Sequence, residues 1–272
     1  LEDDDLVFRT AASDSYLGVA LAERALELGY DETAVMTAND DYNVALAEVF
    51  VESFTGAGGT VTAEQMHEPN KPSYRSELAA LAAGGADTLA VFAYYDGSGT
   101  TVLRQSLENG YFTKFIGADG MVDQSLIEQI GADYLRGNSV FMTSAADTDS
   151  EAYKTFAEAY SAAYADEGHD PAGPYVANSY DAAFLLALAI EHAGGTERAN
   201  LSTSLRAVAS APGEPILPGE WAKAVELIAA GEEIDYQGAG GDQDFDENGD
   251  VKGHYTRRVV SEEGAFVTEP AD

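Results

Sequence analysis

The sequence predicts an α/β protein in which a Rossmann-like, doubly wound parallel sheet is accompanied by a partial second α/β lobe. In its first half, short apolar strands alternate with amphipathic helices, which is typical of right-handed βαβ crossovers. Glycines follow most of these helices, where a left-handed residue commonly ends a helix. With 272 residues and 45% apolar composition, the chain is long enough for two lobes with substantial cores.

Six strands are expected in this first half, each bounded by a polar or glycine-containing turn. They are Leu6 to Thr10, Thr33 to Thr37, Val61 to Met66, Thr88 to Phe92, Lys114 to Gly117 and Ser139 to Thr143. Apolar residues at helical spacing, such as Leu17, Leu21 and Ala25, predict the helices between them. The sequence therefore predicts five consecutive strand–helix units.

After Ala145 the pattern changes to helices with few strands between them. These helices are Ser150 to Glu167, Tyr175 to Ala193, Leu201 to Ala209 and Trp221 to Ala230. The segment Ala211 to Gly219 is predicted to be a loop, and Asp242 to Val267 an antiparallel hairpin with Asn248-Gly249 at its tip. A segment with so few strands is a poor candidate for an independent α/β lobe. We therefore expect half of the sheet of this second lobe to be missing.

The charge balance is strongly acidic, with 48 acids, 14 bases and a net charge of -34. The acids are spread along the chain, and concentrated salt screens their repulsion, which indicates a protein adapted to high salt. Nucleic acid is disfavoured as a partner, because phosphate binding needs clustered Lys and Arg. No apolar run is long enough for insertion into a membrane, and the absence of cysteine excludes disulfides and thiolate metal sites.

Three loops of the predicted sheet carry side chains suited to a small zwitterion. They are Asn39-Asp40-Asp41-Tyr42, Tyr94-Tyr95-Asp96-Gly97 and Gly117-Ala118-Asp119-Gly120. The carboxyl ends of parallel strands share one edge of an open sheet, where ligands bind. There the Asp119 carboxylate can pair with an ammonium group, and Tyr42 and Tyr94 can cover an apolar side chain. The alternative is that Asp119 caps the following helix and both tyrosines are ordinary half-buried aromatics.

Motifs for enzyme chemistry, cofactors or metals are weak. The glycine-rich stretches Gly56 to Gly59 and Gly84-Gly85 follow helices, whereas a dinucleotide fingerprint follows a strand and opens a helix. Asp244 to Asp250 imitates the start of an EF-hand loop, but Tyr255 stands where a bidentate glutamate is required. The four histidines are scattered singly, and no G-x-S-x-G motif occurs. The sequence therefore predicts no cofactor, no metal and no enzyme activity.

Several stretches resemble the solute-binding proteins for leucine, isoleucine and valine of ABC importers, which have the type I periplasmic-binding-protein fold. The stretches are Phe8 to Ala11, Asp41-Tyr42, Tyr94-Tyr95, Leu103 to Gln105, Gly117 to Gly120, Asp170 to Val176 and Asp246 to Asp250. The resemblance implies two lobes that close over an amino acid. It also implies that Asp119 holds the ligand ammonium, that Tyr42 and Tyr94 are aromatic pocket residues of the second lobe, and that Tyr175 reaches the cleft from the first. Aspartate in place of glutamate leaves the choice of amino acid open.

The same resemblance implies a domain organisation and a role in transport. Residues 6–143 and 242–272 are expected to form the second lobe, and residues 144–241 the later, mostly helical part of the first lobe. The chain is then a fragment that lacks the N-terminal half of lobe one. The implied function is extracytoplasmic capture of an amino acid and delivery to an ABC permease, although no signal peptide or lipid anchor is visible. A ligand-sensing receptor domain, an amide or urea receptor, and an NAD-dependent enzyme are the alternatives.

Overall fold

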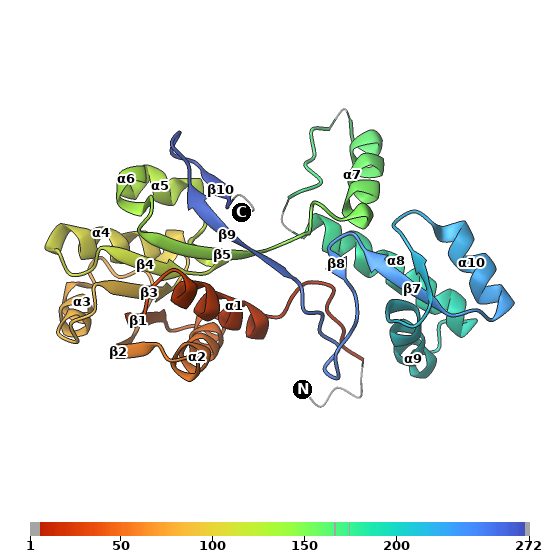
Figure 1. The fold of residues 1–272 in the computed structure, drawn as a ribbon, viewed down its shortest axis with the longest axis horizontal. Helices are drawn as coiled ribbons and strands as arrows, with labels where there is room; N and C mark the ends of the chain where they lie inside the picture. The colour runs from red at the N-terminus through yellow and green to blue at the C-terminus, as the bar shows by residue number, and fades with distance from the viewer. Residues whose placement is uncertain (1–5, 166, 174, 270–272) are drawn as a thin grey trace. The chain divides into compact units, whose positions relative to one another are not determined.

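A seven-stranded sheet of order β10-β9-β5-β4-β3-β1-β2 is the largest sheet of the computed structural model (Figure 1). The structure describes residues 6–165, 167–173 and 175–269. The strands of this sheet are β1 (Glu32–Ala38), β2 (Thr60–His67), β3 (Thr88–Phe92), β4 (Lys114–Gly117), β5 (Ser139–Ala145), β9 (His254–Val260) and β10 (Phe266–Thr268). Pairing is parallel for β1 with β2, β1 with β3, β3 with β4 and β4 with β5, and antiparallel for β9 with β10. The predicted parallel sheet is confirmed.

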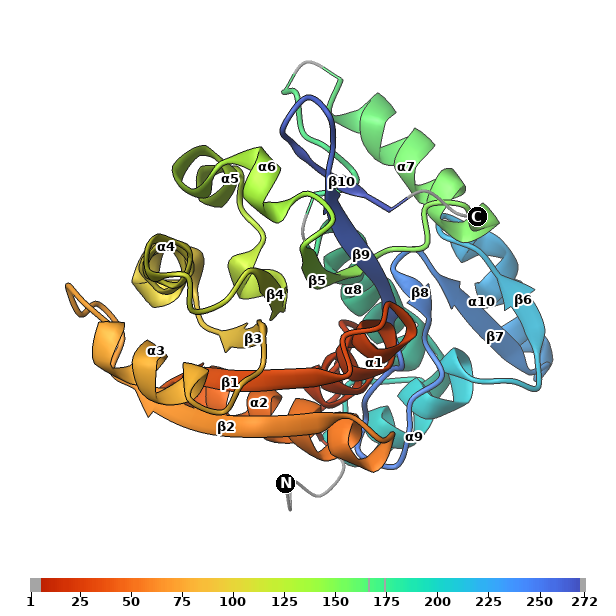
Figure 2. The same cartoon turned by 60° about the vertical axis from the view of Figure 1, so that its left-hand side comes forward.

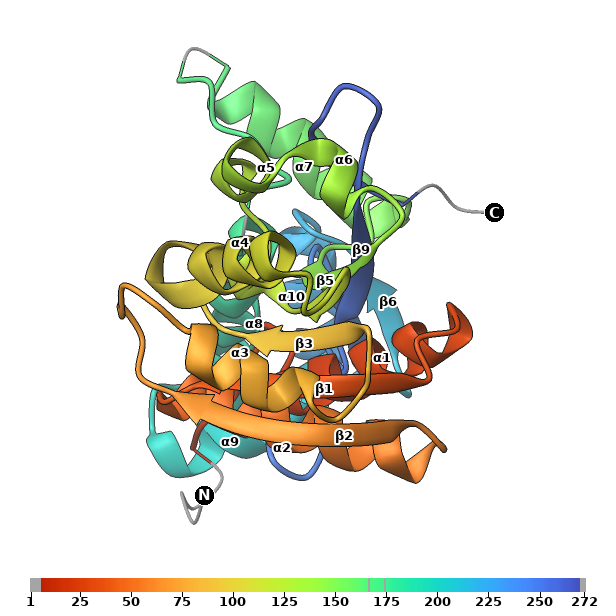
Figure 3. The ribbon, with the colours of Figure 1, turned by 90° about the vertical axis from the view of Figure 1, so that its left-hand side faces the viewer.

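Helices cover both faces of this sheet, as the alternation of its buried side chains requires. The helices are α1 (Asp14–Glu27), α2 (Asp41–Gly56), α3 (Arg75–Ala82), α4 (Thr100–Asn109), α5 (Gln124–Ile130) and α6 (Ala132–Leu135). Val35 shares one core with α1 and α2, whereas its neighbour Met36 shares the other core with α3 to α6. Figure 2 and Figure 3 show β1 between β2 and β3, with α3 and α4 on the same side. The sheet is therefore doubly wound.

A second, smaller sheet of order β6-β7-β8 belongs to the helical half of the chain. Its elements are α7 (Glu151–Ala163), α8 (Val176–Ala193), α9 (Arg198–Ala209), β6 (Glu214–Ile216), α10 (Trp221–Ala230), β7 (Ile234–Gly238) and β8 (Gly241–Asp242). The fully buried carboxylate of Asp181 on α8 accepts hydrogen bonds from Tyr236 OH at 2.7 Å, Ala239 N at 2.8 Å and Gly240 N at 2.7 Å. Through these hydrogen bonds, the Asp181 carboxylate links α8 to β7 and to the residues that follow it.

The described part of the chain divides into two units, one of residues 6–13 and 144–254 and the other of residues 14–143 and 255–269. We call them unit 1 and unit 2. The predicted lobes, 6–143 with 242–272 and 144–241, differ from this division over 6–13 and 242–254, which lie in unit 1. Those two segments are joined by Arg9, whose guanidinium donates to both carboxylate oxygens of Asp250, at 2.5 and 2.9 Å.

Three predicted elements differ from the structure. The strand expected from Leu6 to Thr10 is wrong, because only Arg9 forms a bridge, to Asp250. The predicted loop Ala211 to Gly219 contains the short strand β6, which pairs with β7. The antiparallel hairpin is formed by β9 and β10 around residues 261–265, and not around Asn248-Gly249. There Asp246 Oδ1 accepts the N–H groups of Asn248 and Asp250, which closes a compact turn instead.

Candidate functional site

Neighbouring parallel strands bring three of the four predicted site residues together in unit 2. Strands β4, β3 and β1 are adjacent in the sheet and parallel, so the loops at their carboxyl ends share one edge. Asp119 begins a 3₁₀ turn, η2 (Asp119–Met121), after β4. Tyr94 precedes a π-helical turn, η1 (Tyr95–Gly99), after β3. Tyr42 is the second residue of α2, whose N-cap Asp40 accepts the Asn43 N–H at 2.9 Å.

These three residues, which we call the candidate site, are in direct contact. Tyr42 OH donates to Asp119 Oδ1 at 2.6 Å, and the Gly120 N–H donates to the same oxygen at 2.8 Å. The rings of Tyr42 and Tyr94 stack, with centroids 5.9 Å apart and planes inclined by 23°. Within the described ranges of the chain no group donates to Asp119 Oδ2, and Tyr94 is 47% exposed. One carboxylate oxygen and one aromatic face are thus available to a ligand.

Two glycines allow these turns to approach each other closely. A Cβ at Gly120 would lie 2.9 Å from the Ala93 carbonyl oxygen and 3.3 Å from the Tyr94 ring. A Cβ at Gly99 would overlap the sulfur of Met121. Gly120 is therefore needed for the packing of η2 against the turn that carries Tyr94.

Nearby carboxylates give the surroundings of the two tyrosine rings a negative electrostatic potential. Burial, together with the charge and hydrogen bond of Asp119, raises the pKa of Tyr42 well above its ordinary value, so its hydroxyl keeps its proton. The pKa of Tyr94 is raised by burial and by the carboxylates of Asp40, Asp119 and Asp14. A cationic group is therefore favoured at this edge and an anionic one disfavoured. In the described part of the chain, no cluster of three or more His, Asp or Glu side chains could hold a metal ion.

Asp119 does not cap the helix that follows it. The N-cap of α5 is Asp123, whose Oδ1 accepts the Ser125 N–H at 2.8 Å. Asp119 accepts only from its neighbour Gly120 and from Tyr42, across the sheet edge, among the residues that are described. The capping alternative considered from the sequence is therefore wrong, and the carboxylate is committed to the contact with Tyr42.

Tyr175, the fourth predicted site residue, belongs to unit 1. It precedes α8 with a left-handed backbone, at φ 60°, and is 56% exposed. With Tyr160, Tyr164 and Tyr180 it lines a cavity of about 620 Å³ between α7 and the start of α8. A left-handed conformation is unfavourable for a bulky residue and occurs preferentially at functional positions. Its role in binding stays a prediction.

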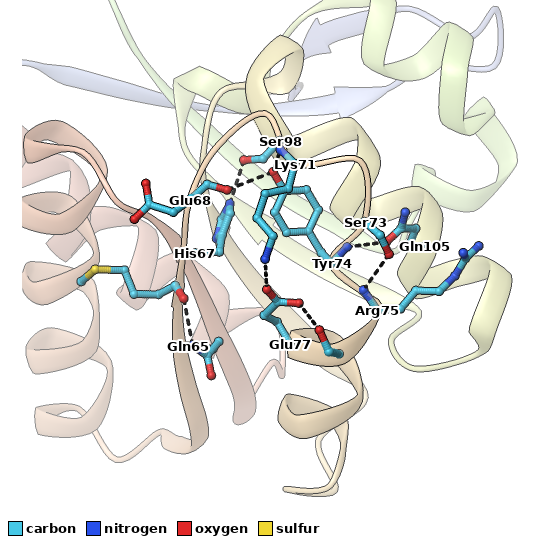
Figure 4. A network of polar contacts seen from close by, with 12 residues as sticks. Gln65, His67, Glu68, Lys71, Ser73, Tyr74, Arg75, Glu77, Ser98 and Gln105 are labelled. Atoms are coloured by element: carbon cyan, nitrogen blue, oxygen red, sulfur yellow. Dashed lines mark hydrogen bonds and ion pairs between the residues drawn. The ribbon is translucent and has the colours of Figure 1, made fainter.

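Sequence reasoning missed the contact of His67 with Ser98, which lies in the turn that follows Tyr94 (Figure 4). His67 ends β2 at the same edge of the sheet, and its Nε2 lies 2.8 Å from Ser98 Oγ in η1. A single histidine after a strand matches no motif. The only indication in the sequence was that His67 directly follows the predicted strand Val61 to Met66, just as the three candidate loops follow their own predicted strands.

The doubly wound sheet with its second α/β unit is the fold of type I periplasmic binding proteins, a class of substrate-binding proteins. The chain belongs to the periplasmic binding protein family, whose family model matches residues 2–256. None of the helices in the described ranges has both the length and the apolar character to cross a bilayer.

Three relatives illustrate this membership. A substrate-binding protein of a chemotactic signal transduction system, BasB of Halobacterium salinarum, is 37% identical over 75 residues, which are 28% of this chain and 18% of that protein. The leucine-binding protein LivK of Thermotoga maritima has a TM-score of 0.74 at 24% identity, over 99% of this chain and 68% of that one. LivJ of Streptococcus pneumoniae, in complex with isoleucine, has a TM-score of 0.65 at 20% identity, over 97% and 68%. The two structural likenesses establish the fold.

Proposed function

We propose that this chain captures a small amino acid, of branched-chain type or similar, and performs no chemistry on it. In this proposal Asp119 Oδ2 accepts a hydrogen bond from the ligand ammonium group, and the stacked rings of Tyr42 and Tyr94 cover the ligand side chain. Tyr175 is the fourth proposed ligand-binding residue, on the resemblance to the family. The observation that carries the proposal is the contact of one carboxylate with two phenol rings, among acids that favour a cation.

The captured solute is delivered to an ABC permease outside the cytoplasmic membrane. Support comes from the family and from the printed descriptions of LivK and LivJ, a leucine-binding protein and a branched-chain amino acid transporter protein bound to isoleucine. Delivery is tested by uptake of labelled leucine into vesicles that carry the cognate permease. Uptake that is the same with and without the protein contradicts this part.

Calorimetry in molar salt, with leucine, isoleucine, valine, alanine and glutamate, tests the binding site. A hydrogen bond to a charged group contributes about 1.5–3 kcal/mol, so Asp119→Asn is expected to weaken amino-acid binding about 10- to 100-fold. Asp96→Asn is the matched control, because it removes the same charge from an exposed position in the neighbouring turn η1. Equal affinity of Asp119→Asn and wild type would contradict the assigned site, and no heat with any amino acid would contradict the solute class.

A second candidate function is ligand sensing, with the same site and a signalling partner. It is favoured by the relative whose name places it in a chemotactic signal transduction system. Swimming of cells in a leucine gradient, compared with cells lacking the gene, separates the two functions. Lost chemotaxis with intact leucine uptake indicates sensing, and lost uptake with intact chemotaxis indicates transport.

A further inference from the structure

His67 is a buried polar side chain at the end of the edge strand β2. It is 4% exposed, and its Nε2 lies 2.8 Å from the hydroxyl of Ser98, which is 2% exposed. Its ring packs against the Tyr74 ring in a T-shaped arrangement, with centroids 4.9 Å apart and planes at 77°. Figure 4 shows the imidazole beside the Tyr74 ring, with its hydrogen bond directed to Ser98.

This one residue contacts both loops that carry the phenols of the candidate site. Its carbonyl oxygen accepts the N–H of Asn39 at 2.8 Å, at the start of the loop that leads to Tyr42. Its imidazole shares a hydrogen bond with Ser98, in the turn that follows Tyr94. The backbone link to Asn39 does not depend on the side chain, so a change of the imidazole alters only the link to Ser98.

The turn that contains Ser98 is closed on Tyr94 itself. The N–H groups of Gly97, Ser98 and Gly99 all donate to the Tyr94 carbonyl oxygen, at 3.1, 3.2 and 3.0 Å. A displacement of Ser98 therefore moves the hydrogen bonds that orient the Tyr94 backbone. The turn η1 continues directly into α4, and π-helical turns of this kind are rare and occur frequently at functional sites.

The imidazole is itself held in place. Tyr74 OH accepts the Lys71 N–H at 2.9 Å and donates to the Glu68 carbonyl at 3.1 Å, and Tyr74 N–H donates to Gln105 Oε1 on α4 at 2.8 Å. The loop between β2 and α3 is thus wrapped around the ring against which His67 packs. Burial lowers the pKa of His67 to about 4, so the imidazole is neutral near pH 7.

We propose that His67 is a positioning residue of the solute site: through Ser98 it fixes the turn η1, which holds the Tyr94 ring over Tyr42 and Asp119 and thereby sets the affinity for the ligand. The effect on affinity rests on the proposed function, whereas the effect on the turn does not. His67 touches neither Tyr94 nor the ligand in this scheme. It acts only through the hydrogen bond to Ser98.

Amide hydrogen exchange of the full chain without ligand tests the first step. Ser98→Ala and His67→Phe each remove the bond, the second while keeping a ring against Tyr74. Loss of one hydrogen bond is expected to speed exchange of the Gly97 and Gly99 amides about five- to tenfold, with the amides of α5 unchanged. Ser106→Ala is the matched control. It removes a fully buried serine hydroxyl that bonds only within α4, to the Val102 carbonyl at 2.8 Å. Unchanged Gly97 and Gly99 exchange in both variants overturns the proposal.

A double-mutant cycle on leucine affinity tests the second step, with His67→Phe, Tyr94→Ala and the pair. If His67 acts through Tyr94, His67→Phe weakens leucine binding in the wild-type background and has no effect in the Tyr94→Ala background. An equal loss in both backgrounds overturns the proposal. If leucine and the other amino acids fail to bind wild type, the proposed function fails, and the exchange rates still decide whether His67 holds the turn.

Discussion

The buried imidazole of His67 makes the stability of unit 2 depend on pH in a defined window. Its pKa is lowered from 6.5 to about 4, first by burial, and the residue is 4% exposed. Below about pH 6.5 the unfolded chain takes up a proton that the folded chain refuses until about pH 4. The contribution of His67 is therefore fully present above pH 6.5 and is lost as the pH falls to about 4.

The size of this effect follows from the two pKa values. At about 1.4 kcal/mol per pKa unit, lowering the pH from about 7 to about 4.5 is expected to cost about 2–3 kcal/mol of unfolding free energy through this group. Of the charged neighbours of the ring, Glu77 has a pKa of about 2, because Lys71 and Ser76 donate hydrogen bonds to it, so it stays ionised throughout. Ionisation of Glu77 therefore does not contribute to the pH dependence over this window.

Urea unfolding of wild type and His67→Phe, followed by circular dichroism in molar salt from about pH 7 to about pH 4.5, measures this contribution. Both proteins carry the same acids, so the difference in unfolding free energy between them isolates the imidazole. We expect the stability of wild type to fall by about 2–3 kcal/mol more than that of the variant. A difference that stays constant over this range would refute the reasoning, because it would mean that the folded state accommodates the charged ring.

Three further predictions concern the fold and its charge. Asp181→Ala leaves three buried donors without an acceptor, at a cost of about 1–3 kcal/mol each. It should therefore destabilise unit 1 by more than Tyr236→Phe, which removes only one hydrogen bond. Urea unfolding followed by Trp221 fluorescence measures the unfolding free energies of the two variants. Gly120→Ala should cost about 1–3 kcal/mol of stability and weaken amino-acid binding, because its Cβ meets the preceding turn at Tyr94; unchanged calorimetric affinity would contradict this. With a net charge of -34, the urea midpoint should rise between about 0.1 M and 1 M KCl, where the Debye length falls from about 10 Å to 3 Å; a flat midpoint would contradict the inferred salt adaptation.

The parallel sheet and the meeting of its three loops could be predicted because both follow from local pattern. Buried runs such as Thr88 to Phe92 and Lys114 to Gly117, each followed by a helix, allow essentially one arrangement, a right-handed parallel sheet. Once the strands are parallel, their carboxyl ends share an edge. The contact of Asp119 with Tyr42 is a consequence of that topology and of the order of β4, β3 and β1.

The remaining features depend on contacts between distant segments. Leu6 to Thr10 looks like a strand because it is apolar, but Phe8 packs edge-on against Phe245, with centroids 5.0 Å apart, and Leu6 is 42% exposed. The strand β6 has three residues and exists only through its pairing with β7. The support from His67 could not be predicted either, because the reach of its side chain to Ser98 depends on the three-dimensional path of two loops.

The position of β9 beside β5 has a consequence for synthesis of the chain. Arg257 of β9 donates to the Ser139 carbonyl of β5 across a separation of 118 positions. A nascent polypeptide emerging from the ribosome therefore exposes β5 as an unpaired edge until residues 254–260 have been translated. Such an edge is a template for pairing with other chains, so association between nascent chains is favoured during this interval.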